Sequence, residues 1–227
     1  MGVFSIKIKP KEKKSAFILG SLFFFVISAG ITASAARDAI FLVKYDRSFL
    51  PLMFVAIAVT MYFIIPVYKS ITRGKDQIFI ITTSTLIFST SLFLFQRTLA
   101  GFGIPLLFIW VEIINVLSIM QFWILAGEIY NPRQAKRLFS YIAAGGSLAA
   151  IFAGYLIKPY IRIYGSENLL NLSILFFFGT ILIAQLMRGQ NKKSTTKPKI
   201  KNAKKTKLKI GEYLQSIAFM VGTVAFI

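Results

Sequence analysis

Cysteine and histidine are both absent from this chain of 227 residues. Their absence excludes disulfide bonds, thiolate or imidazole metal sites, cysteine nucleophiles and serine–histidine–aspartate triads. Acidic residues are scarce, with eight Asp and Glu against 27 Lys and Arg, and they are too scattered for a hydrolase-type carboxylate pair. A P-loop is missing as well, because Gly74-Lys75 is followed by Asp76 instead of Ser or Thr. We therefore expect neither catalysis nor a cofactor.

Apolar residues, in contrast, are abundant. They make up 56% of the chain and include 23 Phe, whereas soluble domains usually hold about 45–50%. An apolar segment of about 20 residues crosses the hydrocarbon core of a bilayer, which is roughly 30 Å thick. Six segments meet this requirement: 16–36, 49–68, 78–95, 104–127, 138–157 and 169–187. The sequence predicts an all-α, polytopic transmembrane helix bundle at 16–187, with the lipid bilayer as its surroundings.

Basic residues predict the orientation of this bundle. Residues 1–15 carry five Lys and one Glu and form a basic tail. If this tail is cytoplasmic, most Lys and Arg of the loops fall on the cytoplasmic side, as the positive-inside rule requires. We expect a multi-pass protein of a bacterial inner membrane. Alternatively, the basic start, the apolar run and Ala33-Ser34-Ala35 resemble a cleavable signal peptide, although the five later spans favour an uncleaved helix.

The composition changes after the sixth span. Residues 188–212 hold ten basic residues and one acidic residue, together with Pro198 and Gly211. No aromatic residue lies among them to stack on bases, so we expect no nucleic-acid partner but a cytoplasmic linker attracted to anionic headgroups. Residues 213–227 are apolar but shorter than a span. They predict a truncated seventh transmembrane helix, with an amphipathic surface helix as the alternative.

One carboxylic acid, Glu112, lies well inside the span 104–127. A carboxylate at this depth is costly unless it is protonated, paired or turned toward a polar environment, and it is therefore a candidate functional group. Asn115 and Ser118 follow at three-residue spacing on the same side of a helix, opposite Trp110 and Gln121. This polar stripe is a poor lipid face, so we expect it to look into the bundle.

A second charged position follows the first span. Arg37-Asp38 is succeeded by the apolar AIFLV, so the pair is expected inside a long or tilted first helix. Gly30, Ser34 and Arg37 share one helical face, which suits a close helix contact or a cavity. The alternative is that Arg37 extends to the outer headgroups.

Axial counting predicts how far Arg37 lies from Glu112. Counted at 1.5 Å per residue from Ala16 and Ile104, the two residues differ in depth by about 13 Å. We therefore expect a shared cavity and no direct salt bridge.

Smaller patterns predict helix contacts. Thr82, Thr85 and Ser89 share a face that lines a water-filled path, or else their hydroxyls bond to backbone carbonyls. Gly146, Ala150 and Gly154 recur every four residues and favour close approach of another helix.

The turn before the fifth span has its own signals. Asn131 is expected to cap the helix and Pro132 to take its first position. Arg133, Lys136 and Arg137 then lie in its opening turns, at the cytoplasmic end.

Several of these residues together resemble one family. The run from Glu112 to Phe122-Trp123, the sequence AKRLF at 135–139 and the glycine-rich helix after it are similar to the non-mitochondrial ATP/ADP translocases of plastids and bacteria. ARDAIFL at 36–42 resembles the first-helix motif of that family. The resemblance implies a major-facilitator-like fold of twelve helices that exchanges nucleotides by alternating access. This chain would then be the N-terminal half, with the missing C-terminal half as its partner.

The resemblance also implies a binding site. Arg37 matches the basic residue of the family's first helix, Glu112 the acid of its fourth, and Lys136 and Arg137 the basic pair of its fifth. With Asp38 and Asn115 added, these residues form the expected substrate site.

The expected function is that of an ATP-binding antiporter: secondary transport by alternating access that exchanges nucleotides of the ATP/ADP type across a membrane. A nucleotide carries three or four negative charges, and Arg forks suit its phosphates. Two alternatives remain: a non-transporting anchor or sensor domain of a larger protein, and a proton-coupled carrier in which Glu112 titrates.

Overall fold

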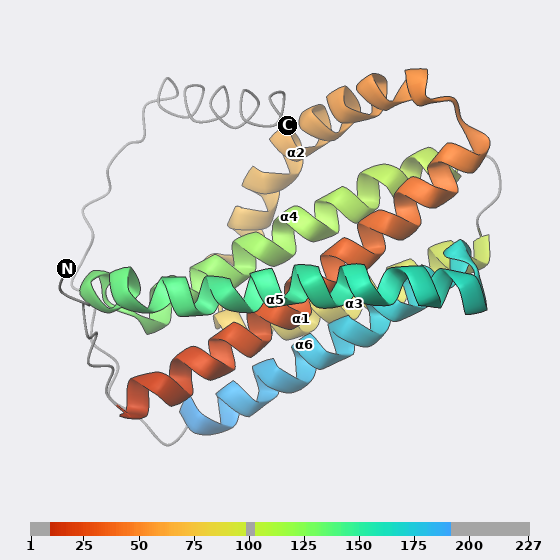
Figure 1. The fold of residues 1–227 in the computed structure, drawn as a ribbon. Helices are drawn as coiled ribbons and strands as arrows, with labels where there is room; N and C mark the ends of the chain where they lie inside the picture. The colour runs from red at the N-terminus through yellow and green to blue at the C-terminus, as the bar shows by residue number, and fades with distance from the viewer. Residues whose placement is uncertain (1–9, 99–102, 192–227) are drawn as a thin grey trace, which may run out of the picture. The chain divides into compact units, whose positions relative to one another are not determined.

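The computed structural model describes residues 10–98 and 103–191, and these residues form six long helices (Figure 1). The helices are α1 (Pro10–Lys44), α2 (Leu50–Thr72), α3 (Gln77–Thr98), α4 (Gly103–Ile129), α5 (Pro132–Tyr164) and α6 (Leu169–Asn191). Two short 3₁₀ helices, η1 (Arg47–Phe49) and η2 (Ser166–Asn168), connect α1 to α2 and α5 to α6. All six long helices are apolar and long enough to cross a membrane. The predicted all-α transmembrane bundle is confirmed, whereas the predicted seventh helix and most of the basic linker lie outside the described residues.

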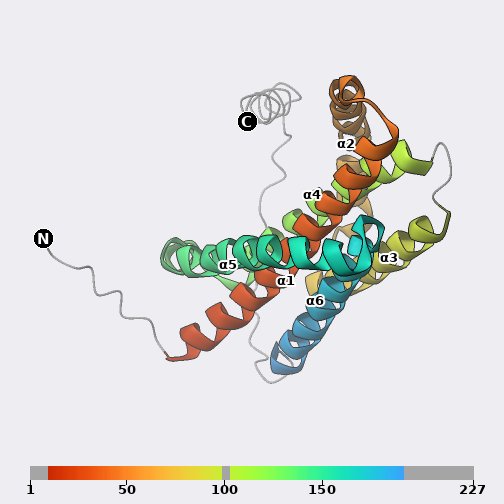
Figure 2. The ribbon, with the colours of Figure 1, turned by 45° about the vertical axis from the view of Figure 1, so that its right-hand side comes forward.

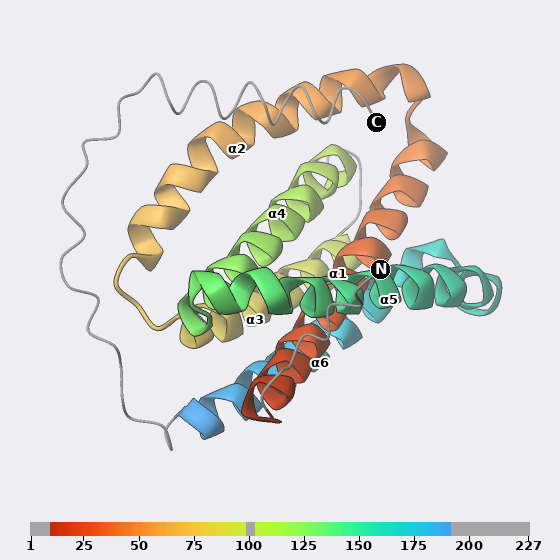
Figure 3. The ribbon, with the colours of Figure 1, turned by 60° about the vertical axis from the view of Figure 1, so that its left-hand side comes forward.

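Helix α1 occupies the centre of the bundle. It packs against α4, α5 and α6, while α3 packs against α4 and α6. Helix α2 packs mainly against α4 and lies apart from α5 and α6 (Figure 3). The order across the bundle is therefore α5, α1, α4, α2, with α6 and α3 joined to the central pair.

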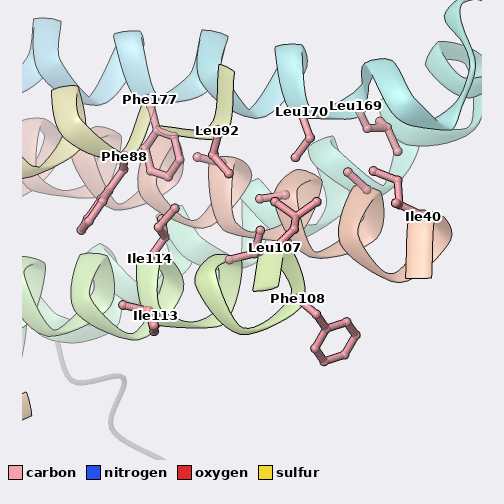
Figure 4. Close-up of a cluster of buried hydrophobic side chains, with 14 of the residues drawn as sticks. Ile40, Phe88, Leu92, Leu107, Phe108, Ile113, Ile114, Leu169, Leu170 and Phe177 are labelled. Atoms are coloured by element: carbon pink, nitrogen blue, oxygen red, sulfur yellow. The ribbon is translucent and has the colours of Figure 1, made fainter. Parts of the chain in front are cut away.

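The η1 and η2 helices mark one end of the bundle, which we call the η end. α1, α3 and α5 finish there, and α2, α4 and α6 begin there. A hydrogen bond of 3.2 Å from the Gln96 side-chain amide to Asn168 Oδ1 joins the end of α3 to η2. In Figure 4, Leu107 of α4 lies toward Leu92 of α3 and Leu170 of α6 within one buried cluster. This cluster fixes the depth at which α1, α3, α4 and α6 meet.

Helix α1 extends well beyond the span 16–36, as the apolar residues after Asp38 predicted. Its 35 residues measure about 52 Å, more than the roughly 30 Å of a bilayer core. The helix ends where Asp46 accepts a hydrogen bond of 3.3 Å from the backbone N–H of Ser48 and starts η1. Arg37 and Asp38 are therefore part of a continuous helix.

The start of α5 follows the predicted capping. Pro132 stands in its first turn, and the Asn131 backbone N–H donates a hydrogen bond of 3.2 Å to the Gln134 side chain. The helix ends at Gly165, whose φ of +83° suits glycine. Helix α5 extends beyond the expected span 138–157 at both ends, and it continues past Pro159, which lies inside the helix.

Glycines set the closest approach of α1 and α5, which cross in Figure 2. A Cβ on Gly145 would overlap the backbone oxygen of Gly20, so the two backbones touch there. Gly145 is followed on its face by Ala149 and Ala153, both fully buried. The predicted contact series of Gly146, Ala150 and Gly154 was wrong after its first member, because Ala150 and Gly154 are exposed.

The hydroxyls of α3 bond to their own helix. Thr82 donates to the carbonyl of Ile78, and Ser89 to that of Thr85, each at 2.9 Å. Of the two predicted roles, the structure therefore shows hydrogen bonding to backbone carbonyls of the same helix.

Replacing Gly145 by Ala is expected to destabilise the bundle by about 1–3 kcal/mol, because the added methyl group cannot fit against Gly20. The matched control is Gly154→Ala, where no atom lies within 4 Å of the added Cβ. Thermal unfolding in detergent, followed by tryptophan fluorescence, measures both variants. Equal unfolding temperatures for the two would contradict the glycine contact.

Candidate functional site

A charged cluster joins α1 to α4. Arg37 Nη1 donates to Glu112 Oε2 at 2.6 Å, and Arg37 Nε donates to Asp38 Oδ1 at 2.8 Å. The guanidinium carbon also lies 4.3 Å from the centre of the Phe108 ring, a cation–π distance. Arg37 is only 8% exposed, while the side chains of Glu112 and Asp38 are 32% and 49% exposed. The cluster is anchored inside the bundle and open on its carboxylate side.

The expectation of no direct salt bridge was wrong. Arg37 lies seven residues before the end of α1 at Lys44, and Glu112 lies nine residues after the start of α4 at Gly103. Counted from the η end, these positions are about 10 and 14 Å deep, so their depths nearly agree. The sequence-based count failed because it took Ala16 as the start of a straight span, whereas α1 begins earlier and continues further. The alternative that Arg37 extends to the headgroups is wrong too, because its guanidinium is held by Glu112 and Phe108.

A neutral contact lies next to the ion pair. Asn115 Nδ2 donates to Ser34 Oγ at 2.8 Å. Asn115 Oδ1 is buried, has no hydrogen-bond partner among the described residues, and lies 2.9 Å from the position of a Cβ on residue 30. Gly30 therefore provides the space that the amide needs. We call Gly30, Ser34 and Arg37, together with Glu112 and Asn115, the α1–α4 polar seam.

This seam confirms the predicted orientation of the α4 stripe. The polar face of α1 and the polar face of α4 were each recognisable from the sequence, but the contact between the two faces was not. Ser118, the third member of the stripe, is buried, and no residue in the described ranges is a hydrogen-bond partner of its hydroxyl. The stripe therefore faces the interior, and only its first two members bond to α1.

The opposite face of α4 binds α3. Trp110 Nε1 donates to Ser91 Oγ, and Ser84 Oγ donates to Gln121 Oε1, both at 2.8 Å. Gln77 Nε2 adds a bond of 3.2 Å to the carbonyl of Gln121. These partners were missed by the sequence reasoning. The available signal was the seven-residue spacing of Ser84 and Ser91, which places them on one face of α3.

The expected basic pair does not join the cluster. Lys136 and Arg137 lie in the first turns of α5, and the side chain of Lys136 is outside the described part of the structure. Glu112 is 17 residues from the end of α4, or about 25 Å along the helix, and α5 begins beyond that end. The six expected site residues therefore form two separate groups. Arg37, Asp38, Glu112 and Asn115 lie toward the η end, and Lys136 and Arg137 lie at the opposite end.

The chemistry of the cluster follows from its charges. One guanidinium faces two carboxylates, so the carboxylates exceed the cations by one. A guanidinium has five N–H donors, and Arg37 uses two of them, on Nε and Nη1. Nη2 has no acceptor in the described part of the chain. The site can accept an anionic oxygen at Arg37 or a cation at its carboxylates, and no described group of three acidic residues could bind a metal ion.

The chain matches no protein-family model, no curated protein and no solved structure. Any assignment of function consequently depends on the geometry of the seam and on the resemblance of its residues.

The ion pair is expected to couple the stabilities of its two partners. Arg37→Gln should destabilise the bundle more than Glu112→Gln, because it leaves two carboxylates without their cation. In the double variant the interaction energy should be about 0.5–3 kcal/mol. Unfolding in detergent of the two single variants and the double variant measures it. Arg97→Gln, on an exposed arginine of α3, is the control; additive effects within error at 37 and 112 would contradict the pair.

Proposed function

We propose that this chain forms the membrane domain of a secondary transporter that works by alternating access and exchanges nucleotides. The observation that carries the proposal is the charged cluster of Arg37, Asp38 and Glu112 within membrane-spanning helices. Ionisable residues in such helices are rare, and they mark substrate or ion pathways. The proposal includes a major-facilitator-like arrangement and a second half that completes the path.

A membrane anchor needs no such cluster. Apolar residues of similar size at positions 37 and 112 could pack α1 against α4 about as well as an ion pair does. Partial exposure of both carboxylates points the same way, because it leaves the cluster accessible to a ligand. These two arguments favour transport over the anchor or sensor alternative.

The substrate class follows from charge and resemblance. Arg37 is the basic group of the seam, and its guanidinium has unused donors for phosphate oxygens. Lys136 and Arg137 provide a basic entrance at the opposite end of the bundle. The resemblance of residues 105–154 to the ATP/ADP translocases selects nucleotides among anionic metabolites.

The proposed orientation places the N-terminus in the cytoplasm of a bacterium and the η end outside its inner membrane. Arg73 and Lys75, between α2 and α3, and Arg188, near the end of α6, lie opposite the η end. The positive-inside rule supports this direction.

A proton-coupled carrier is the second candidate. The observation that favours it is the excess of one carboxylate in the cluster, which a bound proton would neutralise. In that case Glu112 or Asp38 carries the proton, and a pH gradient drives uptake.

Arg37→Ala and Glu112→Gln are each expected to reduce exchange of labelled ATP for internal ADP at least tenfold, because each removes a charge from the pathway. Proteoliposomes that contain equal amounts of folded protein provide the measurement. Glu128→Gln, an exposed acid near the end of α4, is the matched control and should exchange normally.

Three other outcomes of the exchange assay would contradict the proposal. Normal exchange in both variants would remove the site assignment. Exchange of no nucleotide by the intact protein would favour the anchor, and uptake that depends on a pH gradient would favour the proton-coupled carrier.

A further inference from the structure

Among the described residues, Glu112 is the only hydrogen-bond partner of the Arg37 guanidinium on another helix. The second carboxylate, Asp38, is the next residue of α1, so its bond moves together with Arg37. Phe108 of α4 contacts the guanidinium through its ring face, without a directional bond. The charged link between α1 and α4 is thus a single hydrogen-bonded contact of 2.6 Å.

That contact also determines whether an anion can bind. A phosphate oxygen at Nη2 would be attracted by one positive charge and repelled by two carboxylates at similar distances from the guanidinium. The attraction and the repulsion nearly cancel while both carboxylates remain in place. Moving Glu112 away removes one repulsion and releases a second donor, on Nη1. The 32% exposure of the Glu112 side chain shows that it borders open space.

We propose that Glu112 and an anionic oxygen of the substrate compete for the Arg37 guanidinium, so that substrate binding releases α1 from α4. This inference rests on the proposed transport function and adds a mechanism for coupling binding to helix movement. The anion replaces the Glu112 carboxylate as the acceptor of Nη1–H, while Asp38 keeps Nε–H and holds the guanidinium in its orientation. We call the Arg37–Glu112 contact the latch.

The position of the latch determines where movement occurs. It lies about 10–14 Å from the η end by helix rise. On that side, Phe41 of α1 and Phe108 of α4 have ring centroids 4.8 Å apart. On the other side lie the Asn115–Ser34 bond and the Gly30 contact. Toward the other end, stacked Phe23 and Phe122, with ring centroids 4.4 Å apart, join α1 to α4. Nine residues of α4 lie on the η-end side of Glu112 and 17 on the other side, so release of the latch is expected to separate the helices at the η end, where the shorter segment is packed.

Binding of inorganic phosphate and of ATP to purified protein tests the competition. Glu112→Gln removes the charge and leaves only a weaker, neutral bond to Nη1, and it should bind both anions at least about tenfold tighter than the wild type while its exchange rate falls. A purely structural role would lower both affinity and rate. Arg37→Gln should abolish binding, with Arg97→Gln as the matched control. Unchanged or weaker phosphate binding by Glu112→Gln, or no phosphate binding by either protein, would overturn the latch.

Spin-label distances test the movement. The chain has no cysteine, so Val43→Cys and Leu106→Cys can place two labels at exposed sites of α1 and α4 on the η-end side of the latch. Phosphate should lengthen this distance, and Glu112→Gln should lengthen it without phosphate. Labels at Phe17→Cys and Ile124→Cys, exposed sites toward the opposite end, should keep their distance.

Asp38→Asn separates the latch from a general charge effect. It removes a neighbouring carboxylate but leaves the bond between the helices, so it should strengthen phosphate binding without lengthening the distance in the absence of anion. Equal lengthening in Asp38→Asn and Glu112→Gln would overturn the proposal.

The latch and the transported substrate can fail independently. A protein that exchanges nucleotides, but whose phosphate affinity is unchanged by Glu112→Gln, keeps the transport function and loses the latch. A protein that exchanges no nucleotide, yet shows the tenfold gain and the longer distance, keeps the latch and loses nucleotide exchange.

Discussion

The burial of the Arg37 guanidinium constrains the rest of the bundle. A guanidinium cannot lose its charge under ordinary conditions, so at this depth it needs acceptors, and the nearest on another helix is Glu112. Meeting that requirement fixes the depth of α4 relative to α1. It also requires α1 to continue as a helix past Ala36, because an earlier end would place Arg37 in a loop. The ion pair and the apolar cluster around it therefore constrain the length of α1 and the register of α4 together.

Small residues let the other helices reach α1. Lipid tails are as apolar as leucine, so helices in a membrane associate through close packing and hydrogen bonds instead of a hydrophobic driving force. Gly20 meets α5 and Gly30 meets α4. Toward α6, the carbonyl of Ala29 accepts a hydrogen bond of 2.8 Å from Ser173. A central helix with three neighbours needs such residues on several faces, and for this reason α1 shows no single apolar side.

The sequence predicted the six spans and both faces of the polar seam, because hydropathy and helical periodicity are local properties. It did not predict which residues meet. The depth of Arg37 depends on where α1 begins and how it tilts, and these are set by packing. Likewise, the segment after Tyr141 contains two small-residue frames, one at Gly145 and one at Gly146. Both series have the same four-residue spacing, and only the contact with Gly20 shows that the series starting at Gly145 faces α1.

The charge imbalance of the cluster distinguishes the seam from a simple packing contact between two helices. A balanced pair would be satisfied by its own partner, and an apolar contact would hold the helices without any desolvation cost. One guanidinium between two carboxylates is different, because every arrangement leaves one carboxylate less well compensated than the other. Asp38 moves with Arg37 and cannot leave it, so only Glu112 can exchange places with another anion or accept a cation. In the proposed mechanism, the charged contact between α1 and α4 is thus also the contact whose partner changes.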